Sequence, residues 1–73
     1  MEVLQSRMYT HYKGAKYLVL FVAEESTNSR GKDKVVVYVS LTYGKIKCRD
    51  LSEFVEVVEW PDGKKRPRFM LVD

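Results

Sequence analysis

The most suggestive chemistry in the sequence is a short basic stretch near the middle of the chain. Four of its residues stand two positions apart: Tyr43, Lys45, Lys47 and Arg49. Because residues two apart share one face of a β-strand, this spacing predicts a row of cations with an aromatic ring at one end. Alternate residues of a strand lie about 6.6 Å apart, close to the spacing of phosphates along nucleic acid, and an aromatic ring can stack on a base. The row therefore predicts a nucleic-acid-binding strand face.

Other charged residues would add to the positive charge of this row or reduce it. Arg66 and Arg68, near the last turn, would extend the basic surface if they lie beside the row. Acidic residues would weaken it if they pair across strands with the cations. These acidic residues are Glu53, Glu56, Glu59 and Asp62. The alternative interpretation is an ordinary solvated strand face, on which lysines prevent pairing with another strand edge.

A second hypothesis is a protein-interaction module. Its candidate residues are aromatic side chains that would line a groove for a peptide or a partner chain: Tyr9, Tyr12, Tyr38 and Trp60. Aromatic residues are enriched in protein interfaces, and aromatic grooves bind extended peptides. Trp60 stands before a turn, where it either plugs one end of the domain or is exposed as an anchor. The sequence leaves both binding functions open and places DNA or RNA before a protein partner.

Catalysis and metal binding are the least supported functions. The chain has one histidine, His11, and one cysteine, Cys48. A zinc site needs about four ligands, and a histidine base needs a nearby nucleophile and an orienting group. No glycine-rich elbow or oxyanion signature supports His11 and Cys48 as such a pair. We therefore predict no catalytic residue, no metal, no cofactor and no enzyme activity, with Cys48 as a small buried side chain.

Composition limits the size and the setting of the protein. The 73 residues suffice for one domain, and 45% of them are hydrophobic, enough for a small dense core. The longest apolar run, 17–23, is far shorter than the roughly 20 residues of a membrane-spanning helix. The beginning of the chain lacks the apolar segment of a signal peptide. We expect a cytoplasmic protein without a membrane segment, whose net charge of +3 permits nucleic-acid binding without requiring it.

The order of apolar runs and turn residues predicts an all-β chain. Expected strands span 8–13, 16–24, 35–42, 45–49, 54–60 and 66–72, after a short leader at 1–7. A polar loop is expected at 25–34, tight turns at Gly14, Gly44 and 61–63, and one short helical turn at 50–53. Phe21 and Phe69 have the parity expected of core residues. The predicted fold is a small SH3-like antiparallel barrel of five or six short strands, formed by residues 8–73, with an OB-like barrel as the alternative.

Several stretches, taken in order, resemble a known family. They are Tyr-Thr-His-Tyr-Lys-Gly at 9–14, Tyr-Leu-Val-Leu-Phe-Val-Ala at 17–23, Val-Val-Val-Tyr at 35–38, Tyr-Gly at 43–44 and Pro-Arg-Phe at 67–69. Their order and spacing are similar to those of the small bacterial and phage domain of unknown function sixteen fifty-three, over residues 9–72. The resemblance implies an SH3-like β-barrel and no assigned activity. The family more often has an apolar residue at the position of Lys47, so a binding role of Lys47 would be particular to this protein.

Overall fold

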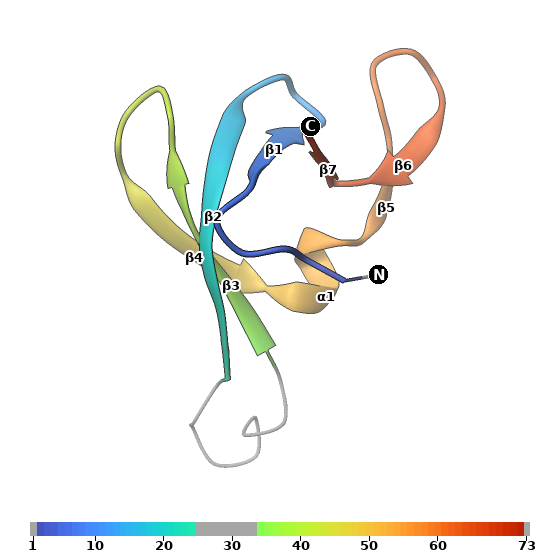
Figure 1. Ribbon diagram of the computed structural model, residues 1–73. Coiled ribbons are helices and arrows are strands. Elements are labelled where there is room, and N and C mark those ends of the chain that lie inside the picture. The colour runs from blue at the N-terminus through green and yellow to red at the C-terminus, as the bar shows by residue number, and fades with distance from the viewer. Residues whose placement is uncertain (1, 25–33, 73) are drawn as a thin grey trace.

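The computed structural model describes residues 2–24 and 34–72, and Figure 1 shows how their elements are arranged. The elements are β1 (Met8–His11), β2 (Lys16–Glu24), β3 (Lys34–Ser40), β4 (Ile46–Asp50), α1 (Leu51–Phe54), β5 (Val57–Glu59), β6 (Lys65–Pro67) and β7 (Phe69–Leu71). The prediction of a mostly β domain with one short helical turn is confirmed, with seven strands among the described residues in place of five or six. The predicted loop at 25–34 lies outside the described residues except for Lys34, which begins β3. No helix in the described ranges has the length and apolar character needed to cross a membrane.

The strands form two antiparallel sheets. The larger sheet has five strands in the order β4-β3-β2-β1-β7, and β5 pairs with β6 in a separate two-stranded sheet. β4 and β7 are the outer strands of the larger sheet, and strand pairing among the described residues does not join them into a closed ring. The larger sheet is curved, and α1 packs against β3 and β4 on its concave side (Figure 1).

The predicted strand at 66–72 is divided between the two sheets. β6 ends at Pro67 and β7 begins at Phe69, so Arg68 is the junction. The backbone N–H of Tyr12 donates to the Arg68 carbonyl at 3.0 Å, and the Arg68 N–H donates to the Glu56 carbonyl at 2.7 Å. The prediction of one continuous strand was wrong because the Arg68 backbone turns from one sheet to the other. These two hydrogen bonds fix Arg68 where the β5-β6 hairpin meets the larger sheet.

A β-bulge in β2 decides which side chains of that strand face the core. Val19 pairs with Tyr38, but Phe21 pairs with Val37, so the register shifts between Val19 and Phe21. A bulge inserts an extra residue and thereby reverses the alternation of faces beyond it. Val19 is fully buried, whereas Phe21 is 55% exposed. The prediction that Phe21 is a core residue was wrong because the bulge interrupts the alternation on which it rests.

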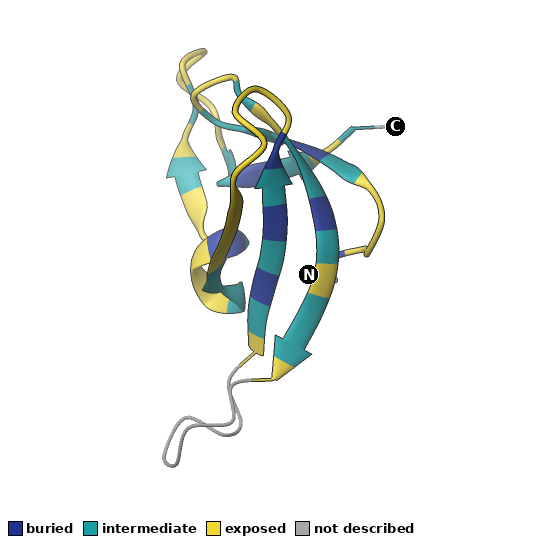
Figure 2. Cartoon of the chain, turned by 90° about the vertical axis from the view of Figure 1, so that its left-hand side faces the viewer, coloured by how far each residue is buried: buried dark blue, intermediate teal, exposed yellow. Residues whose placement is uncertain are grey.

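The core lies on the concave side of the larger sheet. Its buried apolar residues are Val3, Tyr9, Val19, Val36, Tyr38, Phe54 and Phe69. Phe54 of α1 stacks on Phe69 of β7, with ring centroids 4.0 Å apart. Phe69 is 2% exposed, which confirms its prediction as a core residue. Figure 2 shows the buried positions alternating with half-buried ones along β3.

The segment before β1 packs against this core. Val3 is buried, the Leu4 N–H donates to the Tyr9 hydroxyl at 2.8 Å, and the Ser6 N–H donates to the Val19 carbonyl at 2.7 Å. The residues of the predicted leader that the structure describes therefore contribute both packing and hydrogen bonds to the domain.

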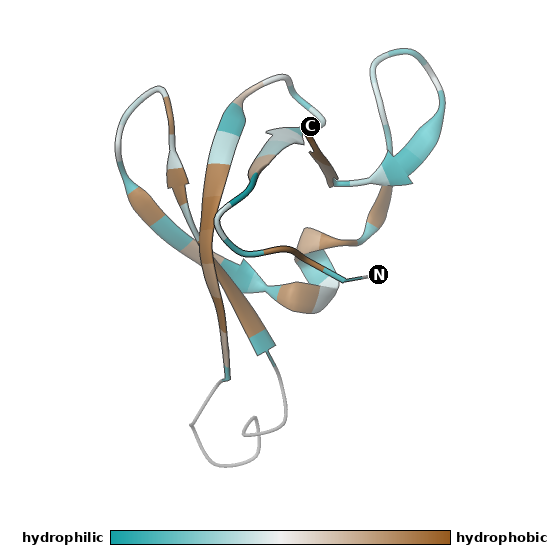
Figure 3. Cartoon of the chain, in the orientation of Figure 1, coloured by the Kyte–Doolittle hydropathy of each residue, from teal (hydrophilic) through white to brown (hydrophobic). Residues whose placement is uncertain are grey.

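The convex side of the sheet is apolar but less covered. Val37 pairs with Cys48, and Val39 pairs with Ile46, so all four side chains lie on this side. Figure 3 shows the apolar run along β2 and β3. Ile46 is 69% exposed and Cys48 is exposed. The prediction that Cys48 is buried was wrong, because the core side of β4 is occupied by its basic residues.

Candidate functional site

The basic residues of β4 lie on the concave side of the sheet. Tyr38 pairs with Lys47, and Val36 pairs with Arg49. Directly opposed residues of antiparallel strands share one face, so Lys47 and Arg49 lie on the side of the buried Tyr38 and Val36. The prediction that Lys47 and Arg49 share a face opposite Cys48 is confirmed. Since β4 is an outer strand, the concave side is only partly covered there, and charged side chains reach solvent from it.

Arg49 is half-buried and is held over the aromatic core. Its Nε donates to the Tyr38 hydroxyl at 3.4 Å, and its guanidinium carbon lies 5.8 Å from the centre of the Phe69 ring. The negative face of an aromatic ring attracts a guanidinium. Phe69 belongs to β7, at the opposite edge of the sheet from β4. The curvature of the sheet therefore brings residues of its two outer strands together.

Tyr43 does not belong to the strand that carries Lys47 and Arg49. β4 begins only at Ile46, and the preceding turn is organised by the buried Ser40. The Ser40 hydroxyl accepts the Tyr43 N–H at 3.1 Å, and the Ser40 N–H donates to the Lys45 carbonyl at 2.9 Å. Tyr43 is 77% exposed in this turn. The prediction that Tyr43 belongs to the same strand as Lys47 and Arg49 was wrong because Tyr43 lies in the turn, whereas Lys45 directly precedes β4 and is bonded to Ser40 at the end of β3.

The two arginines near the last turn have separate surroundings. Both terminal nitrogens of Arg66 pair with the Asp62 carboxylate, at 3.1 and 2.7 Å, and this pairing lowers the pKa of Asp62. The Arg66 guanidinium also lies 5.5 Å from the Trp60 ring. Arg68 pairs with Glu56 at 2.7 Å, and its Nε donates to the Glu53 carbonyl at 3.0 Å.

Arg68 points toward the end of β1, where a second aromatic group lies. Its guanidinium carbon is 5.9 Å from the centre of the Tyr12 ring, and the Lys13 ammonium is 5.8 Å from the same centre. The Tyr12 ring is 4.6 Å from that of His11. His11 also contacts the rings of Phe69 at 4.8 Å and Tyr17 at 6.2 Å, both edge to face.

His11 therefore connects the two rings that carry cations, Tyr12 under Lys13 and Arg68, and Phe69 under Arg49. Burial lowers the pKa of His11 from its ordinary value of 6.5 to about 4. Four positive charges lower it as well; in decreasing order of effect they are Arg49, Arg68, Lys13 and Lys47. Its Nδ1 accepts the backbone N–H of Lys13 at 3.1 Å, so the neutral ring carries its proton on Nε2. The imidazole is neutral at physiological pH and offers one N–H donor among four cations.

We call this constellation the His11 site. It comprises His11, Tyr12, Lys13, Tyr17, Lys47, Arg49 and Arg68. Three of its cations were predicted as binding residues, but sequence analysis assigned no function to His11, Lys13 or Tyr17. The dense run of tyrosine, histidine and lysine at 9–13 was the available signal. Only the curved sheet and the junction at Arg68 connect that run to β4.

The predicted aromatic groove is only partly present. Tyr9 and Tyr38 are 4% and 3% exposed, so the structure places them in the core and not on a surface. Tyr12 and Trp60 do line one shallow groove of about 340 Å³, together with Lys13, Glu59 and Pro61. Trp60 is half-buried, and its Nε1 donates to the Pro67 carbonyl at 3.0 Å.

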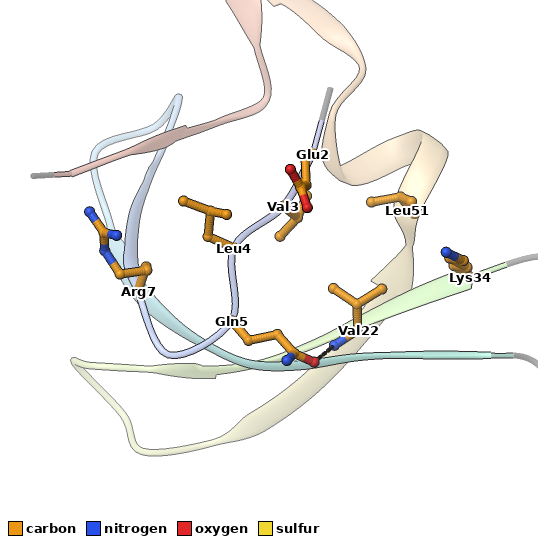
Figure 4. A pocket seen from close by; sticks show the side chains of 8 residues that line it. All are labelled: Glu2, Val3, Leu4, Gln5, Arg7, Val22, Lys34 and Leu51. Atoms are coloured by element: carbon orange, nitrogen blue, oxygen red, sulfur yellow. Dashed lines mark hydrogen bonds between the residues drawn. The ribbon is translucent and has the colours of Figure 1, made fainter.

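A larger hollow of about 650 Å³ lies between the segment before β1, β2 and α1 (Figure 4). Leu4, Val22 and Leu51 give it an apolar lining, and the Val22 N–H donates to the Gln5 side chain at 2.9 Å. Its charged lining residues, Glu2, Arg7 and Lys34, carry both signs, so this hollow does not concentrate positive charge as the His11 site does. In the described part of the chain, no three His, Cys, Asp or Glu side chains are grouped so that they could hold a metal ion.

The fold and this site define a small all-β domain with a basic, aromatic surface on its concave side. A family model described as "Protein of unknown function (DUF1653)" matches residues 7–71, and the chain belongs to this family. A crystal structure of a DUF1653 protein from Bordetella bronchiseptica is 33% identical, with a TM-score of 0.75 over 94% of this chain and 87% of that chain. The resemblance read from the sequence is thereby confirmed. No curated protein matches the chain.

Proposed function

We propose that this domain binds single-stranded nucleic acid through the His11 site, without catalysing a reaction. The observation that supports the proposal is that three cations lie over two neighbouring aromatic rings on one partly open face, Lys13 and Arg68 over Tyr12 and Arg49 over Phe69. Lysine and arginine neutralise phosphates, and aromatic rings stack on bases that are not paired in a duplex. Single-strand binding uses both kinds of group, and here the cations lie over two of the rings that contact His11.

The proposal changes which of the predicted residues are expected to bind. Lys47 and Arg49 remain because they lie on the concave face of β4, and Arg68 remains because its guanidinium lies over Tyr12. Tyr43 is expected to contribute little because it lies in the β3-β4 turn, and Lys45 because it precedes β4 and is farther along the chain from Arg49 than Lys47 is. Arg66 is expected to contribute less than Arg68, because both of its terminal nitrogens are already bonded to Asp62.

The test is fluorescence anisotropy with short DNA and RNA single strands and a DNA duplex, each with 5′-phosphate and with 5′-hydroxyl ends. We expect single strands to bind more tightly than the duplex, with an affinity that falls as salt is added. Lys47→Ala is expected to weaken binding about 3- to 10-fold, in the range of a charge-assisted contact. Lys45→Ala is the matched control, an exposed lysine two positions away, and is expected to leave binding unchanged. Absence of binding to every strand at low salt would overturn the proposal.

A peptide-binding function is the second candidate, and the groove between Tyr12 and Trp60 is the observation that favours it. Proline-rich peptides bind shallow grooves lined by aromatic side chains. The test is titration of a proline-rich peptide, read by the fluorescence of Trp60, the one tryptophan of the chain. A saturable change in Trp60 emission supports this function, and an unchanged spectrum contradicts it.

A further inference from the structure

The basic residues of the His11 site meet at a point and do not form a track. Proteins that follow a single strand over several nucleotides place cations along an extended groove. Here Tyr43, which would have begun the row, lies in the β3-β4 turn, and Arg66 is engaged by Asp62. Lys13, Arg49 and Arg68 come from three separate parts of the chain and lie over Tyr12 and Phe69, two of the rings that contact His11. The arrangement is suited to one phosphate group and not to a succession of them.

The charge of the site also favours a particular kind of phosphate. The Glu56 carboxylate pairs with Arg68, whereas Lys13 and Arg49 lie over the rings of Tyr12 and Phe69. A phosphodiester within a strand carries one negative charge, and a terminal phosphate carries about 1.5 to 2 at neutral pH. Concentrated positive charge discriminates in favour of the more highly charged group. A terminal phosphate therefore fits this site better than an internal one.

The rings beside these cations are few. Tyr12, His11 and Tyr17 are half-buried neighbours, with His11 in the middle. Because the three residues are half-buried, part of each remains accessible to a base, and the Nε2–H of the neutral imidazole is a donor for a phosphate oxygen or a base acceptor. The packing of His11 against Phe69 and Tyr12 fixes the orientation of that donor.

We propose that the His11 site binds one nucleotide that carries a terminal phosphate, either as a free nucleoside monophosphate or as the phosphorylated end of a single strand. This inference rests on the proposed function and narrows its ligand. Lys13, Lys47, Arg49 and Arg68 surround the phosphate, and the rings of Tyr12, His11 and Tyr17 contact the base. The rest of a strand lies outside the site and adds little affinity.

The experiment compares ligands that differ in the phosphate and in length. The probes are adenosine, adenosine 5′-monophosphate, and oligoadenylates of increasing length with either a 5′-phosphate or a 5′-hydroxyl, titrated at low salt. We expect the 5′-phosphate to increase affinity about tenfold or more, as a charge-assisted contact to several cations does. Beyond the first nucleotide, we expect length to change affinity less than the phosphate does. Binding of adenosine 5′-monophosphate identifies a free nucleotide as a sufficient ligand, whereas binding of phosphorylated strands alone identifies the chain end.

Two variants connect this result to the site. Lys47→Ala, at an exposed position, and Arg49→Lys, which keeps the charge but loses the planar guanidinium, are expected to reduce the preference for the 5′-phosphate. Arg66→Gln is the control outside the site and is expected to keep the preference. Equal affinity for phosphate and hydroxyl ends, with affinity that grows steadily with length, would overturn this inference and leave single-strand binding intact. Absence of binding to all strands would instead overturn the proposed function itself.

Discussion

Two arginines two residues apart, Arg66 and Arg68, have nearly the same immediate partners. Each guanidinium lies over an aromatic ring, at 5.5 Å for Arg66 and 5.9 Å for Arg68, and each pairs with a carboxylate at 2.7 Å. The difference lies in what surrounds them. Arg66 closes the tip of the β5-β6 hairpin with Trp60 and Asp62, whereas Arg68 joins three other cations around His11. An arginine on a ring is therefore not a site by itself, and the excess of charge at one place distinguishes the His11 site from the hairpin.

The largest expected effect is a loss of stability, which compares the contributions of the His11 site and the β5-β6 hairpin to folding. Phe69 lies under both Arg49 and His11 and stacks on Phe54, so Phe69→Ala is expected to destabilise the domain by about 3–5 kcal/mol. Trp60 is half-buried in the hairpin, and Trp60→Ala is expected to cost less, about 1–2 kcal/mol. Urea unfolding followed by circular dichroism measures both. Equal losses would mean that the hairpin is as much a part of the core as Phe69.

The comparison between the two arginines is tested directly by binding. Arg68→Gln is expected to weaken nucleotide binding about tenfold, because it removes one of the cations that surround His11. Arg66→Gln is expected to change affinity by less than about twofold, since Asp62 already engages its guanidinium. Melting curves of both variants provide the control for folding. Similar losses of affinity in the two variants would contradict the distinction between the His11 site and the hairpin.

The pH dependence of stability tests the electrostatics of the His11 site. The pKa of His11 is about 4 in the folded domain and 6.5 ordinarily, so the unfolded chain binds more protons between these values. The neutral His11 ring therefore makes its full contribution to stability above about pH 6.5, and this contribution is lost as the pH falls toward 4. Because the half-buried ring is partly screened by solvent, we expect a loss of about 1 kcal/mol. Urea unfolding at several pH values, with His11→Phe as the control, measures it, and an identical pH dependence in the variant would contradict the assignment.

The smallest expected effect concerns the ion pair of the hairpin. Asp62→Asn removes the carboxylate that engages Arg66, but this pair joins an exposed residue of the turn to a half-buried residue of β6, and both side chains remain accessible to solvent. Exposed ion pairs contribute little to folding. We expect a melting curve within experimental error of the parent and an unchanged preference for the 5′-phosphate. A gain in affinity after this change would show that the hairpin is continuous with the His11 site.

Local patterns of the sequence predicted much of this protein. The positions of the turns at Gly14, Gly44 and Gly63 follow from residue type, and all three glycines have the positive φ angles that favour glycine. The strand character of the chain and the alternation of Lys47, Cys48 and Arg49 between two faces follow from the period of two in a β-strand. The resemblance to the family rests on stretches spread along nearly the whole chain, and the family model that matches residues 7–71 confirms it.

Only the tertiary structure decided which face of each strand lies against the core and which faces solvent. Alternation gives two faces, but a single bulge between Val19 and Phe21 turned Phe21 outward. On β4, the basic face lies on the core side, because an outer strand of a curved sheet is covered only in part and its charged side chains still reach water. The same curvature brings Arg49 of β4 over Phe69 of β7 and next to His11. These contacts join residues far apart in the chain, so they depend on the summed twist, bulge and pairing of all the strands and not on any local run of residues.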